Sequence, residues 1–171
     1  MKASVVAIES CSGVMVAKGL LLTAAHCDVG ITKYDIVKKD EEKDLMLVRY
    51  EPKEPYGIAP LGASPEVGDV VRAVGYPLAI GVQYTTTGAV QDVVMDEVAD
   101  APFFKFLMAA STPVIFGNSG GGLFNANGEL VGIASRLASV GYGSPVTHMG
   151  FFVNTETMLQ FLKEAEVIVF K

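Results

Sequence analysis

The sequence predicts an all-β fold, and three observations support that prediction. Short runs of β-prone residues recur along the chain, such as LMLVRY at 45–50 and VVRAVGY at 70–76. Turn-forming residues separate the runs, with most of the 18 glycines lying between them. Only residues 154–166, NTETMLQFLKEAE, have the apolar spacing of a convincing helix. Regularly spaced short strands of this kind are typical of sandwiches and barrels.

The strands are expected where β-branched, aromatic and aliphatic residues gather between turn signals. In chain order these runs are residues 4–8, 13–25, 34–37, 45–50, 70–76, 82–94, 103–110, 121–124, 130–135 and 150–153. The terminal helix is expected to start with Thr155 as its N-cap. Its apolar face would carry Met158, Leu159, Phe161 and Leu162.

The chain is expected to form a single domain, 1–171, made of two lobes. A chain of this length buries roughly 70% of the surface that its unfolded form exposes, enough for a real core. Residues 51–60, EPKEPYGIAP, contain three prolines and so cannot donate a full ladder of hydrogen bonds. We therefore assign 1–50 to a first lobe, 51–60 to a linker and 61–171 to a second lobe with the helix.

Composition excludes several classes of partner. The net charge is −6, with acids and bases scattered along the chain, which argues against nucleic acid. Apolar stretches are a few residues long, well short of the roughly 20 that a membrane-spanning helix needs. Neither a nucleic acid nor a membrane partner is expected.

The N-terminal residues carry no recognisable export signal, because Glu9 interrupts the chain before an apolar core develops. The localisation is therefore left unknown: cytoplasmic or intracellular as written, with a trimmed secreted form as the alternative. Two cysteines, Cys11 and Cys27, are too few for a disulfide framework. Composition alone leaves open either two buried thiols or a single pair.

Three segments carry residues suited to acyl transfer: LLTAAHC around His26, EKDLMLV around Asp44 and FGNSGGGLF around Ser119. A serine hydroxyl needs a base to take its proton, histidine suits that work, and an aspartate orients the imidazole. Glycines next to the serine allow backbone N–H groups to approach an oxyanion. Taken singly, the segments have ordinary alternatives: a flexible turn, a core histidine and a solvated carboxylate. Together, in the order His, Asp, Ser, they favour a catalytic triad.

These segments resemble the signatures of the trypsin/chymotrypsin superfamily of serine proteases, most closely the protease domain of its HtrA (DegP-type) branch without a PDZ module. The similarity extends to CSGVMVAKGLLLTAAHC, to PLGASPEVGDVVRAVGYPLAIG, to FGNSGGGLFNANGELVGIAS and to the closing THMGFFVNTETMLQFL. The resemblance implies two six-stranded antiparallel β-barrels, with the active site between them. The interval from His26 to Asp44 is short for the family, as if a hairpin of the first barrel were missing. Asp40 and Asp35 are kept as fallbacks for that reason.

The resemblance also implies roles for other residues. Gly117 and Ser119 would supply the N–H groups of the oxyanion hole. Ser135 aligns with a serine that supports the buried aspartate, although an ordinary strand hydroxyl is an equal alternative. Asn118 stands where secreted relatives carry an aspartate that binds a new N-terminus, so activation by that route is not expected. Cys11 and Cys27 occupy positions that family members often pair, and would form a disulfide in an oxidising compartment.

Specificity is predicted from the residues that would line the substrate pocket. Pro113 falls near the position that carries a charge in relatives selecting Arg or Lys, and Val114, Ile115 and Phe116 are apolar. Cleavage after an apolar residue is therefore expected. Arg136 and Leu137 follow Ser135 along the strand that binds substrate in the family, and Arg136 is expected to face solvent. Both His148 and Asp69 are interpreted as structural.

The leading hypothesis is a serine endopeptidase that acts on protein or peptide substrates without a cofactor or metal. A self-processing viral protease is a variant of it. The alternative from another class is a catalytically silent relative that binds peptides. The resemblance suggests a homotrimer, although no N-terminal extension of the kind used by such trimers is seen.

Overall fold

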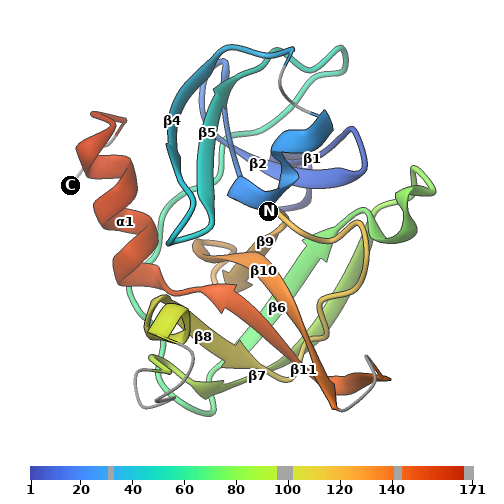
Figure 1. The fold of residues 1–171 in the computed structure, drawn as a ribbon, viewed down its shortest axis with the longest axis vertical. Helices are drawn as coiled ribbons and strands as arrows, with labels where there is room; N and C mark the ends of the chain where they lie inside the picture. Colours follow the sequence, from blue (N-terminus) through green and yellow to red (C-terminus); the bar gives the residue numbers. More distant parts are fainter. Residues whose placement is uncertain (31–32, 96–101, 141–143, 168–171) are drawn as a thin grey trace.

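The computed structural model describes residues 1–30, 33–95, 102–140 and 144–167. The strands form two sheets, one from each half of the chain, and the one α-helix of the described residues, α1, lies beside both (Figure 1). The strands are β1 (Val5–Ile8), β2 (Cys11–Ala17), β3 (Leu20–Thr23), β4 (Ile36–Asp40), β5 (Leu45–Arg49), β6 (Val70–Gly75), β7 (Tyr84–Asp92), β8 (Leu107–Ala110), β9 (Gly122–Asn125), β10 (Leu130–Val140) and β11 (Ser144–Val153).

The first half forms a five-stranded antiparallel sheet in the order β1-β2-β3-β5-β4. Strand β5 is buried on both faces, because Leu45 and Leu47 pack into one cluster while Met46 and Val48 pack into another. This double burial explains why the run LMLV is uniformly apolar instead of alternating. Asp44 directly precedes this buried strand.

The second half is a closed six-stranded barrel in the order β10-β11-β8-β7-β6-β9. The expectation of two six-stranded barrels is therefore met in the second half, whereas the pairing among the described residues leaves the first sheet open with five strands. The short interval between His26 and Asp44 accounts for the smaller first sheet, since it leaves room for the single strand β4.

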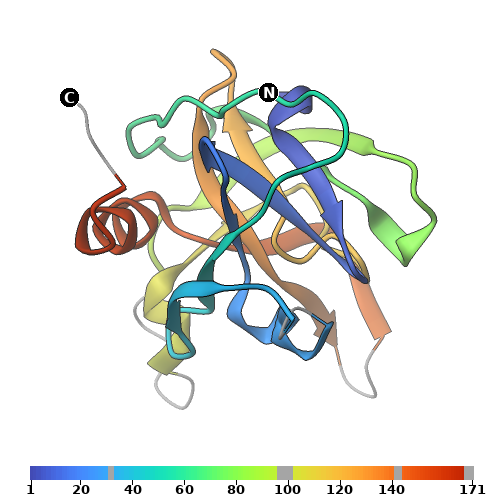
Figure 2. The same cartoon turned by 90° about the horizontal axis from the view of Figure 1, so that it is seen from above.

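One apolar cluster joins the two halves. Val14 and Leu22 of the first sheet pack with Phe124 and Ile133 of the barrel and with Phe161 of the helix. The described residues between β5 and β6 contain one isolated bridge, Leu61 to Leu130, and no strand. Figure 2 shows this connection crossing over the first sheet toward the barrel. The shared core fixes the two sheets relative to each other, and the candidate site lies where they meet.

The helix α1 spans Thr155–Glu164, and its cap differs from the expectation by one residue. Asn154, not Thr155, is the N-cap, with its side chain accepting a hydrogen bond from the Thr157 N–H at 3.0 Å. Thr155 is buried, and its hydroxyl donates instead to the carbonyl of Val131 at 2.6 Å. Both residue types favour a helix start, so composition alone could not choose between them. Within the described residues, no helix is long and apolar enough to cross a membrane.

Candidate active site

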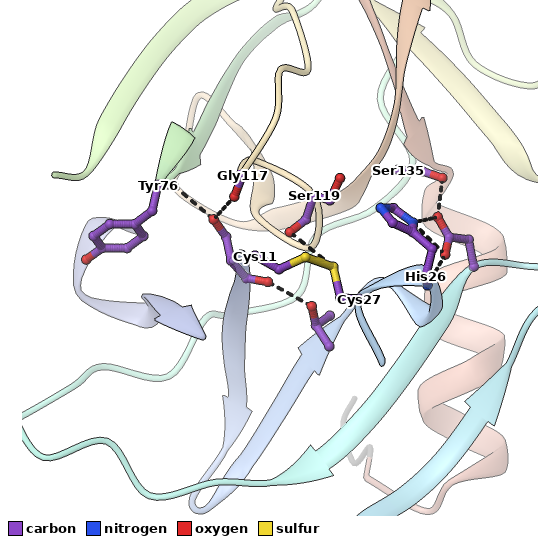
Figure 3. The surroundings of a disulfide bond; sticks show 10 residues. Cys11, His26, Cys27, Tyr76, Gly117, Ser119 and Ser135 are labelled. Carbon is purple, nitrogen blue, oxygen red and sulfur yellow. Dashed lines mark hydrogen bonds and ion pairs between the residues drawn. A yellow bond between two sulfur atoms is a disulfide. The ribbon is translucent and has the colours of Figure 1, made fainter. Parts of the chain in front are cut away.

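His26 and Asp44 lie in direct contact. His26 is in the 3₁₀ turn Ala25–Gly30 that follows β3, and Asp44 closes the turn between β4 and β5. The Nδ1 atom of His26 lies 2.8 Å from Oδ2 and 3.0 Å from Oδ1 of Asp44. The His26 backbone N–H also donates to Oδ1, at 2.9 Å. The carboxylate therefore holds both the ring and the main chain of His26 (Figure 3).

The local backbone aims the Asp44 side chain. Asp44 has a φ of +57°, in the left-handed region, where aspartate is among the few side chains found with some frequency. Its side chain is 7% exposed, while that of His26 is 49% exposed. Ser135, on β10, donates its hydroxyl to Asp44 Oδ2 at 2.6 Å. A buried carboxylate thus has three donors, drawn from both halves of the chain.

The two fallback carboxylates lie elsewhere. Asp40 accepts a hydrogen bond from the Lys43 N–H at 3.1 Å, inside its own turn. Asp35 pairs with Arg49 at 3.1 Å on the surface. Neither contacts His26 among the described interactions.

Ser119 sits in the loop between β8 and β9, and glycine is required on both sides of it. Gly117 and Gly120 have φ values of +95° and +86°. A Cβ on Gly120 would also collide with the carbonyl of Ser12 and the hydroxyl of Thr23. The loop therefore lies directly on the first sheet, where the Ser12 N–H donates to the carbonyl of Ser119 at 2.9 Å.

Within the described structure, several N–H groups of this loop donate no hydrogen bond, and those of Gly117 and Ser119 are among them. Among the described residues, the N–H groups of Gly117 and Ser119 donate no hydrogen bond, whereas those of Asn118, Gly120 and Gly121 all do. Unpaired N–H groups are uncommon in folded proteins unless water or a ligand takes them. The pattern leaves donors at the two positions that the resemblance assigns to an oxyanion hole.

His26 and Ser119 line the same cavity, which has a volume of about 450 Å³. The imidazole of His26 extends toward Ser119 (Figure 3). Among the described residues, no hydrogen bond joins the Ser119 hydroxyl to His26.

Cys11 and Cys27 form a disulfide at the edge of the cavity, with their Cα atoms 6.2 Å apart. It ties the start of β2 to the turn that carries His26. The pairing implied by the family resemblance is thus present, and the alternative of two buried thiols is wrong for this structure. Figure 3 shows the bond beneath Ser119, whose carbonyl lies 3.8 Å from Cys27 Sγ.

Three of the five residues expected to bind substrate line the cavity: Val114, Phe116 and Ser135. Val114 and Phe116 both line the cavity, with Val114 buried and Phe116 68% exposed. Ser135 lines it too, next to Asp44. Arg136 is exposed on β10, and the side chain of Leu137 lies outside the described part of the structure.

The two polar residues interpreted from the sequence as structural, His148 and Asp69, do not line this cavity. His148 and Asp69 are both exposed. The Asp69 carboxylate accepts a hydrogen bond from the Glu66 N–H at 2.9 Å, which caps its own turn. The backbone carbonyl of His148 accepts one from Gln91 at 3.1 Å.

The comparison with known families decides the classification. The sequence model of the trypsin-like peptidase domain matches residues 28–133, more than half of the chain. The chain belongs to the trypsin-like peptidase domain family. The matched range contains Asp44 and Ser119 and begins two residues after His26.

Curated relatives of this trypsin-like peptidase domain are proteases. The chain is 31% identical over 140 residues to the magnetosome formation protease MamE of Paramagnetospirillum magneticum, covering 75% of this chain and 19% of that protein. It is 32% identical over 151 residues to a probable periplasmic serine protease, do/HhoA-like, of Haemophilus influenzae, covering 78% and 32% respectively. The chain thus spans between about a fifth and a third of the length of these relatives.

Solved structures of HtrA-type proteases have a similar fold. The HtrA-type protease AlgW with a decapeptide superposes with a TM-score of 0.78 at 25% identity, covering 92% of this chain and 51% of that one. The HtrA resemblance inferred from the sequence is therefore confirmed for this trypsin-like peptidase domain. The trimer suggested by the same resemblance stays a prediction.

Sequence reasoning missed Ser12 and Leu78, which hold the loop of Ser119 from outside. Ser12 is buried and donates its hydroxyl to the carbonyl of Gly117, while the Leu78 N–H donates to that of Phe116. A serine between Cys11 and an apolar strand gave one weak signal, because a buried hydroxyl needs a partner. Nothing in the sequence identified which partner it would be.

Proposed function

We propose that this chain is a serine endopeptidase in which Ser119 is the nucleophile, His26 the general base and Asp44 the orienting carboxylate. The observation that carries the proposal is the double contact of Asp44 with His26, at a cavity that Ser119 also lines. A carboxylate on Nδ1 holds the tautomer whose other nitrogen accepts the serine proton.

The chemistry proceeds through an acyl-enzyme. Ser119 Oγ attacks the scissile carbonyl while its proton passes to His26, and the imidazolium formed is stabilised by Asp44. The proton then goes to the leaving amine, the C–N bond breaks, and water repeats the sequence on the ester. The free N–H groups of Gly117 and Ser119 stabilise the oxyanion that forms in each of the two stages, acylation and deacylation.

The preferred residue on the acyl side of the cleaved bond is apolar in this proposal. Val114, Ile115 and Phe116 supply an apolar wall, and the described lining of the cavity contains no carboxylate. An arginine or lysine entering this pocket would lose hydration without gaining a partner, which is costly. The substrate is an extended segment of a protein or peptide.

The test is digestion of an unstructured protein such as casein by the wild type and by Ser119→Ala, with the products mapped by mass spectrometry. We expect internal cleavage after apolar residues by the wild type and none by the variant. Equal binding of labelled peptide by both proteins, with no products from either, would overturn the proposal and favour the peptide-binding relative. Cleavage mainly after Arg or Lys would contradict the specificity alone.

The disulfide supports an oxidising compartment for the protein, and thus the exported form over the cytoplasmic one. Structural disulfides persist outside the reducing cytosol. Trapping free thiols with a maleimide reagent in intact cells tests this point. Modification of Cys11 and Cys27 in the native protein would contradict it.

A further inference from the structure

Ser12 connects three elements around the loop of the proposed nucleophile. Its hydroxyl donates to the carbonyl of Gly117 at 2.8 Å and accepts from the N–H of Tyr76 at 2.9 Å. These two bonds join β2 of the first sheet to the end of β6 and to the loop, as the dashed lines to the labelled Gly117 and Tyr76 show (Figure 3). Ser12 is fully buried, so water does not compete for either bond.

The main chain of Ser12 is held independently of its hydroxyl. The Ser12 N–H donates to the carbonyl of Ser119 at 2.9 Å, and its carbonyl accepts from the Thr23 hydroxyl at 2.7 Å. Replacing Ser12 by alanine would leave both of these bonds in place. It would remove only the bridge between Gly117 and Tyr76.

The Gly117 carbonyl belongs to the peptide that lies between the two N–H groups of the proposed oxyanion hole. The Gly117 N–H shares one planar, trans peptide with the Phe116 carbonyl, and the Gly117 carbonyl shares the next one with the Asn118 N–H, so holding both carbonyls fixes the backbone angles of Gly117. The Phe116 carbonyl is bound by the Leu78 N–H, and the Gly117 carbonyl is bound by Ser12. Gly117 has a φ of +95°, and glycine is the residue with the widest choice of other conformations. The Asn118 N–H holds the Gly117–Asn118 peptide from within the loop, by donating to the Ile115 carbonyl, and Ser12 holds it from outside.

We propose that Ser12 is a positioning residue for the oxyanion hole, its hydroxyl holding the Gly117–Asn118 peptide, which lies between the two donors, so that the Gly117 and Ser119 N–H groups converge on one oxygen. This inference rests on the proposed serine endopeptidase function. Ser12 does not line the cavity and does not touch substrate, so its effect is confined to steps in which charge develops on that oxygen.

The test compares Ser12→Ala with Thr155→Val, a matched control. Thr155 is also a buried hydroxyl that donates to a backbone carbonyl, but it lies on α1. Steady-state kinetics on a peptide with an apolar residue before the scissile bond should show kcat lowered about 10-fold to 100-fold by Ser12→Ala with KM unchanged. Thr155→Val should lower Tm without changing kcat.

Inhibition supplies a second measurement. A peptide aldehyde, whose adduct with Ser119 places an oxyanion in the hole, should bind Ser12→Ala more weakly by the same factor as kcat falls. A peptide that ends in an amide and forms no adduct should bind both proteins equally. A kcat in Ser12→Ala equal to that of the wild type, or an equal fall in Thr155→Val, would overturn the inference.

A third measurement keeps this inference separable from the proposed function. If the wild type hydrolyses nothing, the endopeptidase proposal fails, but the backbone amide signals of Gly117 and Asn118 in a nitrogen–proton NMR spectrum still report the loop. They should shift or broaden in Ser12→Ala and not in Thr155→Val. Unchanged signals in Ser12→Ala would overturn the positioning role whatever the activity.

Discussion

Asp44 accepts hydrogen bonds from His26 at two points, the ring Nδ1 at 2.8 Å and the backbone N–H at 2.9 Å. The first sets the tautomer and the second sets the position of the turn that carries the ring. One carboxylate thus determines both where the imidazole lies and which nitrogen is free.

Asp44→Asn is therefore expected to lower kcat roughly 10⁴-fold while leaving the fold intact, because an amide can donate to Nδ1 and stabilise the wrong tautomer. Asp40→Asn is the matched control, since Asp40 ends β4, just before the turn that Asp44 closes, and its carboxylate accepts a hydrogen bond from the Lys43 N–H. Peptide hydrolysis by the two purified variants provides the measurement. A comparable fall in kcat in both variants would show that the effect comes from disturbing the segment between β4 and β5, not from the contact of Asp44 with His26.

Ser135→Ala should lower kcat less than Asp44→Asn does. The Ser135 hydroxyl is one of three donors to the Asp44 carboxylate, and the two from His26 remain when it is lost. We expect kcat to fall roughly 10-fold, in line with the cost of one hydrogen bond to a charged group. A fall as large as that of Asp44→Asn would mean that Ser135 positions the carboxylate by itself.

The catalytic chemistry was more visible in the sequence than the geometry that supports it. His26, Asp44 and Ser119 stand in segments whose residue types are dictated by chemistry, and the glycines around Ser119 are dictated by backbone angles. The contact of Ser12 with Gly117 joins residues 105 positions apart. Such a contact follows from how the two sheets pack, which local patterns do not encode.

Strand prediction failed where local preference and tertiary packing disagree. The run 103–110 is strongly β-prone, yet 102–106 form a 3₁₀ turn and only Leu107–Ala110 pair as β8. The opposite error occurs at β11, which begins at Ser144, six residues before the predicted run 150–153. Pairing with the long strand β10 extends it. Tertiary contacts thus shorten one strand and lengthen the other relative to what local β preference predicts.

Reduction of the disulfide is predicted to destabilise the protein. Cys11 and Cys27 are 16 positions apart, and closing a loop of that size contributes about 3 kcal/mol in the chain-entropy account. The variant with both cysteines changed to serine should melt several degrees lower than the oxidised wild type by calorimetry. An unchanged Tm in the variant would show that packing, not the covalent bond, holds the turn of His26.

Stability should depend on pH through Glu164, near the C-terminal end of α1. A hydrogen bond from Gln160 and the neighbouring Lys38 of β4 lower the pKa of Glu164 below its ordinary value. A carboxyl with a depressed pKa stabilises the fold above its unfolded pKa, and this contribution disappears as the pH falls through the folded pKa. Glu164→Gln should therefore lower Tm slightly at neutral pH, and the difference from the wild type should close in acid.

The control for that experiment is Glu42→Gln. Glu42 is exposed in the turn before Asp44, and no ion pair involves it among the described residues. Its replacement should leave the difference in Tm from the wild type independent of pH. A pH-dependent difference in Glu42→Gln as large as that in Glu164→Gln would assign the effect to overall charge.

The central claim, an activated Ser119 beside a formed oxyanion hole, is tested most directly by treating the folded protein with a fluorophosphonate and measuring its intact mass. We predict a single adduct that maps to Ser119 and is absent from Ser119→Ala and strongly slowed in Asp44→Asn. A folded wild-type protein that forms no adduct would contradict the claim.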